Sequence, residues 1–229
     1  MKVYKALIIR REGVQISIDY AKCCADSCEE WNLPYEYIDA VQFLPCEEAF
    51  ASVGMKKGPN YRNTMGNCGC HSSMIKCWKR IVELNEPCII LEHDAYILGD
   101  VRTIDIPDMS VVTFGGHVDE VDKYQPIGPA KKLTEITRGR GCHAYSITPT
   151  TAKFLLDELE EKGVTVGVDR RLMMSPTMPL YMCDPPQAVA WNRLSTSNMT
   201  DESNGAKFNR IKNSPSMCID SWNLGLKTT

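Results

Sequence analysis

Two carboxylates separated by one residue follow an apolar run within Pro87–Tyr96. The run Cys88–Leu91 ends at Glu92 and Asp94. A short run of β-branched and large apolar residues is typical of a strand buried on both faces, as in a mainly parallel sheet covered by helices. Ligands of such sheets gather at the carboxyl ends of the strands, and carboxylate oxygens suit Mg²⁺ or Mn²⁺. The segment therefore predicts a divalent-cation site at Asp94 and Glu92. The simpler alternative is a strand end with solvated acids.

A cluster of sulfur and nitrogen ligands offers a second kind of metal chemistry. Cys68, Cys70, His71 and Cys77 lie within ten residues of one another and could supply four ligands to zinc. A structural zinc site usually pairs two separated ligand knuckles, and only one is visible here. The chain has 11 cysteines, an odd number spread through apparent helices and strands, which favours reduced thiols that act as small buried hydrophobes.

The elements that must position the two acids begin with a β-α-β unit. Val3–Ile9 has the pattern of a strand, and the apolar residues of Ile16–Trp31 recur at helical spacing. A stop at Asn32-Leu33-Pro34 precedes a further strand at Tyr35–Val41. A helix from about Cys70 to Asn85 then leads into the strand that carries the acids. The predicted class is therefore α/β, with a mainly parallel central sheet flanked by helices.

The second half of the chain continues with alternating strands and helices. The predicted elements are strands at Ser110–Phe114, Cys142–Ile147 and Met178–Met182 and a helix at Pro149–Lys162. Residues 117–140 carry prolines, glycines and many charges, which predicts a long active-site loop. The chain from about Pro185 is predicted to be an irregular polar tail. Without a repeat or a linker, residues 1–229 are expected to form a single domain.

Composition limits the classes of partner. A formal charge of -3 over 229 residues argues against a globally basic nucleic-acid binder, although it leaves room for a local basic groove. No window approaches the ~18 to 20 uninterrupted apolar residues of a membrane span, and the apolar part of the N-terminus is too short for a secretory signal. These observations predict a cytoplasmic protein, of a bacterium or, for a viral chain, of an infected host cell.

Several segments, taken in order, resemble glycosyltransferase family 25, the group that includes lipooligosaccharide and collagen hydroxylysine galactosyltransferases. The resemblance covers about residues 3–198, and it depends on the order and spacing of the pieces more than on any single one. The matching pieces are the Arg10-Arg11 turn, Tyr35–Val41, Gly69–Ser73 followed by Trp78, Cys88–Ala95, His143–Thr148 with Ala152 and Leu155-Leu156, and Val168–Leu172.

The chain departs from the family pattern at two places. The usual Glu-Asp-Asp becomes Glu92-His93-Asp94, which keeps the outer acids, and the Ser-His of the Gly-Cys element becomes Ser73-Met74. Because side chains alternate along a strand, His93 is expected to point away from the face of its two neighbours. Donor or acceptor preference is expected to differ from that of other members.

The resemblance implies a GT-A-like nucleotide-binding sandwich, a nucleotide-sugar donor and Mn²⁺ or Mg²⁺ at Asp94 and Glu92. A UDP-linked hexose such as galactose or glucose is the expected donor, and Arg10, Arg11, Glu92 and Ser195 are the donor-binding candidates. Asp169 is the candidate base of an inverting transfer. It also suits the N-cap of a helix over Arg170–Met174.

The expected acceptor is a hydroxyl on a surface glycan, on a hydroxylated protein side chain or on a hydroxymethylated base of viral DNA. Cationic residues in the two predicted loops, such as Lys56, Lys57 and Lys132, would suit a phosphate-bearing acceptor, a nucleotide donor or solvent equally well. Two other functions fit the same residues. One is metal-dependent phosphoryl or nucleotidyl transfer at the acidic pair, and the other is a zinc-stabilised interaction domain built on the cysteine cluster.

Overall fold

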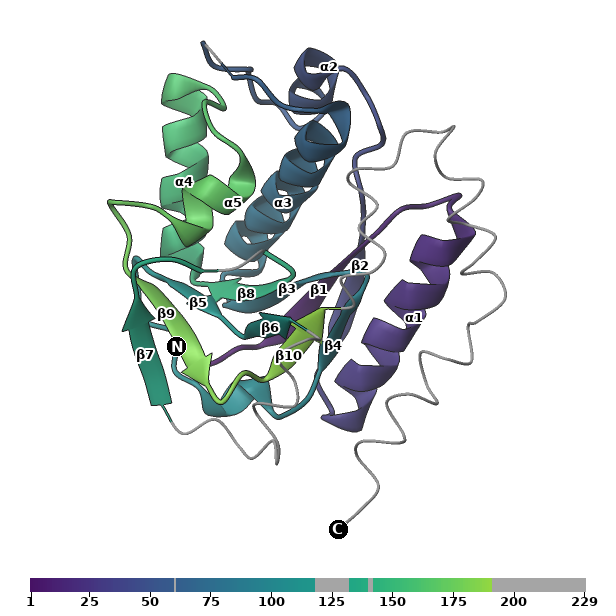
Figure 1. The fold of residues 1–229 in the computed structure, drawn as a ribbon, viewed down its shortest axis with the longest axis vertical. Helices are drawn as coiled ribbons and strands as arrows, with labels where there is room; N and C mark the ends of the chain where they lie inside the picture. Colours follow the sequence, from purple (N-terminus) through teal and green to yellow (C-terminus); the bar gives the residue numbers. More distant parts are fainter. Residues whose placement is uncertain (60, 118–131, 140–141, 191–229) are drawn as a thin grey trace. The chain divides into compact units, whose positions relative to one another are not determined.

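The predicted β-α-β units are present in the computed structural model, which describes residues 1–59, 61–117, 132–139 and 142–190 (Figure 1). Strand β1 (Lys5–Arg10) leads through helix α1 (Gln15–Glu30) to strand β2 (Tyr35–Asp39), which pairs with β1 in parallel. Helix α3 (Met65–Leu84) then returns the chain to β3 (Cys88–Glu92), which pairs in parallel on the other side of β1.

Seven strands form the central sheet, in the order β2-β1-β3-β8-β5-β9-β7. The added strands are β5 (Val111–Thr113), β7 (Lys132–Ile136), β8 (Ala144–Ile147) and β9 (Leu180–Asp184). The pairings give β8 and β7 the opposite direction to the other five strands. The protein therefore has a mixed α/β fold with a mostly parallel sheet, as the sequence predicted.

A second sheet contains three short strands in the order β4-β10-β6. Their bounds are β4 (Ala95–Ile97), β6 (Gly115–His117) and β10 (Ala188–Ala190), and the 3-10 helix η1 (Val101–Thr103) follows β4.

Two predictions about the second half of the chain were wrong. Part of the predicted loop over residues 117–140 is the strand β7, and β10 lies within the predicted irregular tail. The structure also adds a short helix, α2 (Cys46–Ala51), that the sequence analysis did not identify.

Helices cover both faces of the central sheet. On one face lies α1, and on the other lie α2, α3, α4 (Pro149–Lys162) and α5 (Val168–Met173) (Figure 1). Alternation along β1 supplies both cores, because Leu7 and Ile9 pack on the α3 side while Ala6 and Ile8 pack on the α1 side. This burial on both faces explains the continuous apolar runs of β1 and β3. In the described part of the chain, no helix is both long and apolar enough to cross a membrane.

A buried hydrogen bond joins α3 to the sheet and gives a test of the core. Trp78 Nε1 donates to the Tyr145 hydroxyl at 2.8 Å, and both side chains are fully buried. Tyr145→Phe would leave the indole N–H without this acceptor, so we expect the free energy of unfolding to fall by about 1–3 kcal/mol. Urea denaturation measures it, with Tyr4→Phe as the control because Tyr4 is 51% exposed. Equal stability of the two variants would contradict the role of this bond.

Candidate active site

The carboxyl ends of β1, β2 and β3 meet at one edge of the central sheet. Ile9 pairs with Glu92, and Arg10 pairs with Asp39, so the last residues of three neighbouring strands are aligned. Ligands of α/β sheets bind at this kind of edge. The pairing thus brings the predicted residues Arg10 and Glu92 to the same place, although they are far apart in the sequence.

Glu92 ends β3 as a partly buried carboxylate. Its Oε1 accepts a hydrogen bond from Cys70 Sγ at 3.7 Å, and its backbone N–H donates to the His143 carbonyl at 2.9 Å. Burial, together with the charges of Asp94 and Asp169, raises the pKa of Glu92 to about 8, against the opposing effect of the Cys70 hydrogen bond. The second predicted metal ligand and the predicted base therefore both act on Glu92.

His93 and Asp94 lie in a turn between β3 and β4, because the strand ends at Glu92. The imidazole of His93 contacts the Tyr20 ring of α1, with 6.3 Å between centroids, whereas Glu92 contacts α3. His93 thus points away from the face of Glu92, as predicted. The prediction assumed that the strand continues through Asp94. Because the chain turns after Glu92, side-chain alternation does not determine the direction of Asp94. The charge of Asp94 acts both on Glu92 and on Cys24 of α1.

A divalent cation suits this pair of acids. Asp94 Oδ1 is buried without a hydrogen-bond partner, and burial raises the pKa of Asp94. A bound cation would supply the missing partner and offset the repulsion that raises the pKa of Glu92. Within the described residues, no three His, Cys, Asp or Glu side chains form a ready metal cage. Mg²⁺ is commonly held by one or two carboxylates together with substrate phosphates, so two protein ligands fit that mode of binding.

Asp169 lies in the first turn of α5 and is exposed. Its charge reaches Glu92 and Cys70, and the buried Cys142 thiol hydrogen bonds to it. The predicted N-cap role is wrong, because α5 begins two residues earlier than expected and Gly167 is its N-cap residue. An acid in the first turn still interacts favourably with the helix dipole.

The Gly-Cys element of α3 explains how the helix approaches the sheet. A Cβ on Gly69 would lie 2.9 Å from the carbonyl oxygen of Val41, so only glycine allows this contact. Ser73 Oγ accepts from the Val41 N–H at 2.9 Å and fixes the loop after β2 to the helix. This close contact places Cys70 against Glu92. Met74, the departure from the family pattern, is fully buried and accepts a hydrogen bond from Tyr145, so it belongs to the core.

The predicted zinc cluster is not assembled. Cys68 forms a disulfide with Cys46, with 5.2 Å between their Cα atoms. His71 is buried between the rings of Phe50 and Trp78, each with its centroid 5.9 Å away. Cys70 instead faces Glu92. These positions rule out a shared zinc ion. Most cysteines of the described residues are reduced thiols, as expected, and Cys46 and Cys68 are the exception.

The two predicted arginines differ in their contacts. Arg10 lies over the Tyr37 ring at 4.4 Å, and its Nε lies 3.4 Å from Asp39 Oδ1. Arg11 is partly buried, and its backbone N–H donates to Ser17 Oγ at the start of α1. Burial lowers the pKa of the neighbouring His93; Asp94 opposes this shift and Arg11 reinforces it. Arg11 therefore lies near the turn that carries Asp94. Ser195 lies outside the described residues.

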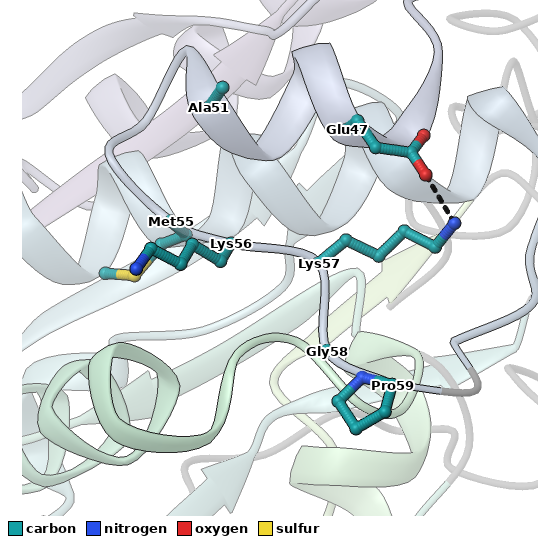
Figure 2. A pocket seen from close by; sticks show the side chains of 7 residues that line it. All are labelled: Glu47, Ala51, Met55, Lys56, Lys57, Gly58 and Pro59. Carbon is teal, nitrogen blue, oxygen red and sulfur yellow. Dashed lines mark hydrogen bonds and ion pairs between the residues drawn. The ribbon is translucent and has the colours of Figure 1, made fainter.

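A pocket of about 530 Å³ lies away from these acids, beside α2 (Figure 2). Its lining includes Met55, Lys56 and Pro59, and the Lys57 side chain reaches Glu47 in an ion pair of 2.5 Å. The backbone of this loop is tied to the segment after α4, because Val164 N–H donates to Lys56 O at 2.8 Å. Lys132, in the other predicted loop, lies 3.8 Å from Asp184. Both Lys57 and Lys132 therefore have acidic partners within the protein.

The raised pKa of Glu92 predicts how stability depends on pH without a divalent cation. The unfolded carboxyl ionises near its ordinary value of 4.5 and the folded one near 8, so stability falls as pH rises across this window. Glu92→Gln removes the titration. We expect it to be more stable than the parent above pH 8 by up to about 5 kcal/mol, given about 1.4 kcal/mol per pKa unit across this window, and equally stable near pH 4.5.

Thermal unfolding in EDTA across this pH range would measure the difference. Glu135→Gln is the matched control, because Glu135 is an exposed strand residue. A difference in stability between Glu92→Gln and the parent that does not change with pH would contradict the raised pKa of Glu92.

Comparison with known proteins supports the family resemblance seen in the sequence. Residues 15–105 match the family model described as "Glycosyltransferase family 25 (LPS biosynthesis protein)". The resemblance to glycosyltransferase family 25 is confirmed. The family match runs from α1 to just beyond η1 and includes Cys70, Glu92 and Asp94, whereas Arg10, Arg11 and Asp169 lie outside it.

Two individual proteins add to this comparison. A Haemophilus influenzae protein named "Putative glycosyltransferase" is 25% identical over 149 residues, which cover 60% of this chain and 52% of the relative. The chain thus spans about half the length of that relative. A crystal structure of a glycosyltransferase involved in the glycosylation of the major capsid of PBCV-1 is 10% identical, covering 69% of this chain and 68% of the other at a TM-score of 0.35.

Proposed function

We propose that this protein is a metal-dependent glycosyltransferase that moves a hexose from a nucleotide-sugar to a hydroxyl acceptor. The observation that supports this most is the position of Glu92 at the carboxyl edge of the parallel strands, where the charges of Asp94 and Asp169 both act on it. Two of these acids belong to the segment that matches glycosyltransferase family 25. The family match supports a nucleotide-sugar as the donor class, and we propose a UDP-linked hexose such as galactose or glucose.

Asp94 and Glu92 are the proposed ligands of Mn²⁺ or Mg²⁺, with the donor phosphates completing the coordination. A cation held there would act as a Lewis acid on the charge that develops on the leaving nucleoside diphosphate. Arg10 and Arg11 follow the end of the neighbouring strand, and guanidinium groups bind phosphate oxygens in bidentate fashion. The site thus offers oxygen ligands for a cation and donors for a diphosphate along one sheet edge.

Asp169 is the proposed general base. It is exposed, so an acceptor hydroxyl can reach it, and its charge is felt by Glu92. The carboxylate would take the hydroxyl proton as the acceptor oxygen bonds to the anomeric carbon and the bond to the nucleotide breaks. Attack from the face opposite the leaving group inverts the anomeric centre. The acceptor class we propose is a hydroxyl on a glycan, on a modified protein side chain or on a hydroxymethylated base of DNA.

Calorimetric titration tests the donor before the acceptor is known. The full chain would be titrated with UDP, GDP, their hexose conjugates and the triphosphates UTP and GTP, each with Mn²⁺ and with EDTA. We expect one nucleotide to bind with Mn²⁺ and to lose affinity in EDTA. Binding of a nucleoside triphosphate in preference to every sugar conjugate would favour phosphoryl or nucleotidyl transfer, and no binding across the panel would contradict the proposal.

A further inference from the structure

Helix α5, which carries Asp169, has little support of its own. It contains six residues and its N-cap, Gly167, offers no side-chain hydrogen bond. Isolated helices shorter than about 12–15 residues are marginal in water, so contacts with the rest of the fold must hold α5 in place. Val168, Leu172 and Met173 provide apolar burial. Apolar packing is non-directional, however, and does not by itself fix how far the helix slides or turns.

Arg171 supplies a directional contact from the same helix. Its side chain is buried, and Nη1 donates to Glu158 Oε2 of α4 at 2.5 Å. The guanidinium also lies close enough to α3 to act on His71. Burial lowers the pKa of His71 to about 3, and the charge of Arg171 contributes to that shift. Arg171 therefore lies where α3, α4 and α5 meet.

An ion pair of this kind is a poor source of net stability. The Arg171 side chain is buried while Glu158 stays 25% exposed, so the arginine loses its hydration for the attraction of a partly solvated partner, and well-packed apolar residues often stabilise a protein equally well. The planar guanidinium, in contrast, fixes the direction of its hydrogen bond to a carboxylate. The pair is therefore better explained by the alignment of α5 that it imposes than by a contribution to the free energy of unfolding.

We infer that Arg171, held by Glu158, is a positioning residue that keeps Asp169 beside Glu92. Asp169 lies two residues before Arg171 on this one-and-a-half-turn helix, so a shift of α5 carries it along. The same shift would break the contact between Asp169 and the buried Cys142 thiol. This inference rests on the proposed function, in which Asp169 is the base.

The test compares Arg171→Met, Arg171→Lys and Glu158→Gln with the control Arg170→Met in the full chain. Arg170 is the exposed neighbour of Arg171 on the same helix. Three quantities would be measured: kcat and KM for the donor, calorimetric affinity for the nucleotide with Mn²⁺, and the rate at which iodoacetamide alkylates Cys142 in the folded protein. The alkylation rate reports the position of α5 without any need for transfer activity.

We expect Arg171→Met and Glu158→Gln to lower kcat about 100-fold, the scale for a reacting group misplaced by ~1 Å, with donor KM and nucleotide affinity unchanged. Cys142 alkylation should rise in both variants and stay at the parent rate in Arg170→Met. Arg171→Lys should recover part of kcat, because it keeps the charge but loses the planar geometry. If Arg171→Met does not fold, Glu158→Gln and Arg171→Lys decide the matter.

An unchanged kcat in Glu158→Gln would overturn the inference. A parallel fall in kcat, in nucleotide affinity and in the protection of all buried cysteines from alkylation would also overturn it, because that pattern indicates general destabilisation. If the parent protein transfers no sugar at all, the proposed function fails instead. Cys142 alkylation then still decides whether the Arg171–Glu158 pair fixes α5.

Discussion

Replacing Asp94 with asparagine is expected to abolish sugar transfer and Mn²⁺-dependent donor binding while the fold stays intact. Asp94 Oδ1 is a buried oxygen without a hydrogen-bond partner, and burial already raises the pKa of this carboxyl. Asparagine keeps the size of the side chain but removes the charge that a cation would neutralise. Losing several kcal/mol of transition-state stabilisation corresponds to a rate lower by roughly 1,000-fold or more.

Two measurements separate this effect from damage to the fold. Calorimetry with the nucleotide and Mn²⁺ should show weak binding for Asp94→Asn that EDTA does not weaken further. Thermal unfolding in EDTA should show a variant at least as stable as the parent, because a buried charge has been removed. Asp157→Asn is the control, since Asp157 is an exposed acid of α4 that pairs only with Lys153 among the described contacts. Normal transfer by Asp94→Asn would end the metal assignment.

The elements that position Asp94 and Glu92 could be predicted from the sequence because their patterns reflect burial directly. β1 and β3 are buried on both faces and therefore have continuous apolar runs, and α4 occupies Pro149–Lys162 as predicted, with Thr148 as its N-cap. The start of α3 was predicted five residues too late. Its first turn, Met65–Gly69, is rich in glycine and polar residues and so lacks the apolar periodicity of a helix. Thr64, whose side chain caps the helix, was the only sign in the sequence of where the helix begins.

Other features depend on contacts between distant segments. The Cys46–Cys68 disulfide needs α2 beside α3, and α2 itself is a six-residue helix with little periodicity to detect. β7 is an exposed edge strand that pairs with β9 across 40 or more residues, so its segment resembles a charged loop. The contacts of Cys70 with Glu92 and of Arg171 with Glu158 likewise have no local signal.

Replacing Asp169 with asparagine is expected to lower kcat by about 100- to 10,000-fold, the range for loss of a general base. Nucleotide affinity with Mn²⁺ should stay close to that of the parent, because Asp169 lies on α5 and is not a proposed cation ligand. The change in stability should be small. Asp169 is exposed, Gly167 is the N-cap of α5, and an acid in the first turn contributes only about 0.3–1 kcal/mol through the helix dipole.

Rescue by a second carboxylate distinguishes a base from a residue that only orders α5. Asp169→Glu keeps a carboxylate and should recover part of the rate, whereas Glu160→Gln, at an exposed acid of α4, should behave like the parent. An Asp169→Asn enzyme with parental kcat would show that another group takes the proton. A large loss of stability with a parallel loss of nucleotide binding would show instead that the carboxylate, through its contact with Cys142, holds the site together.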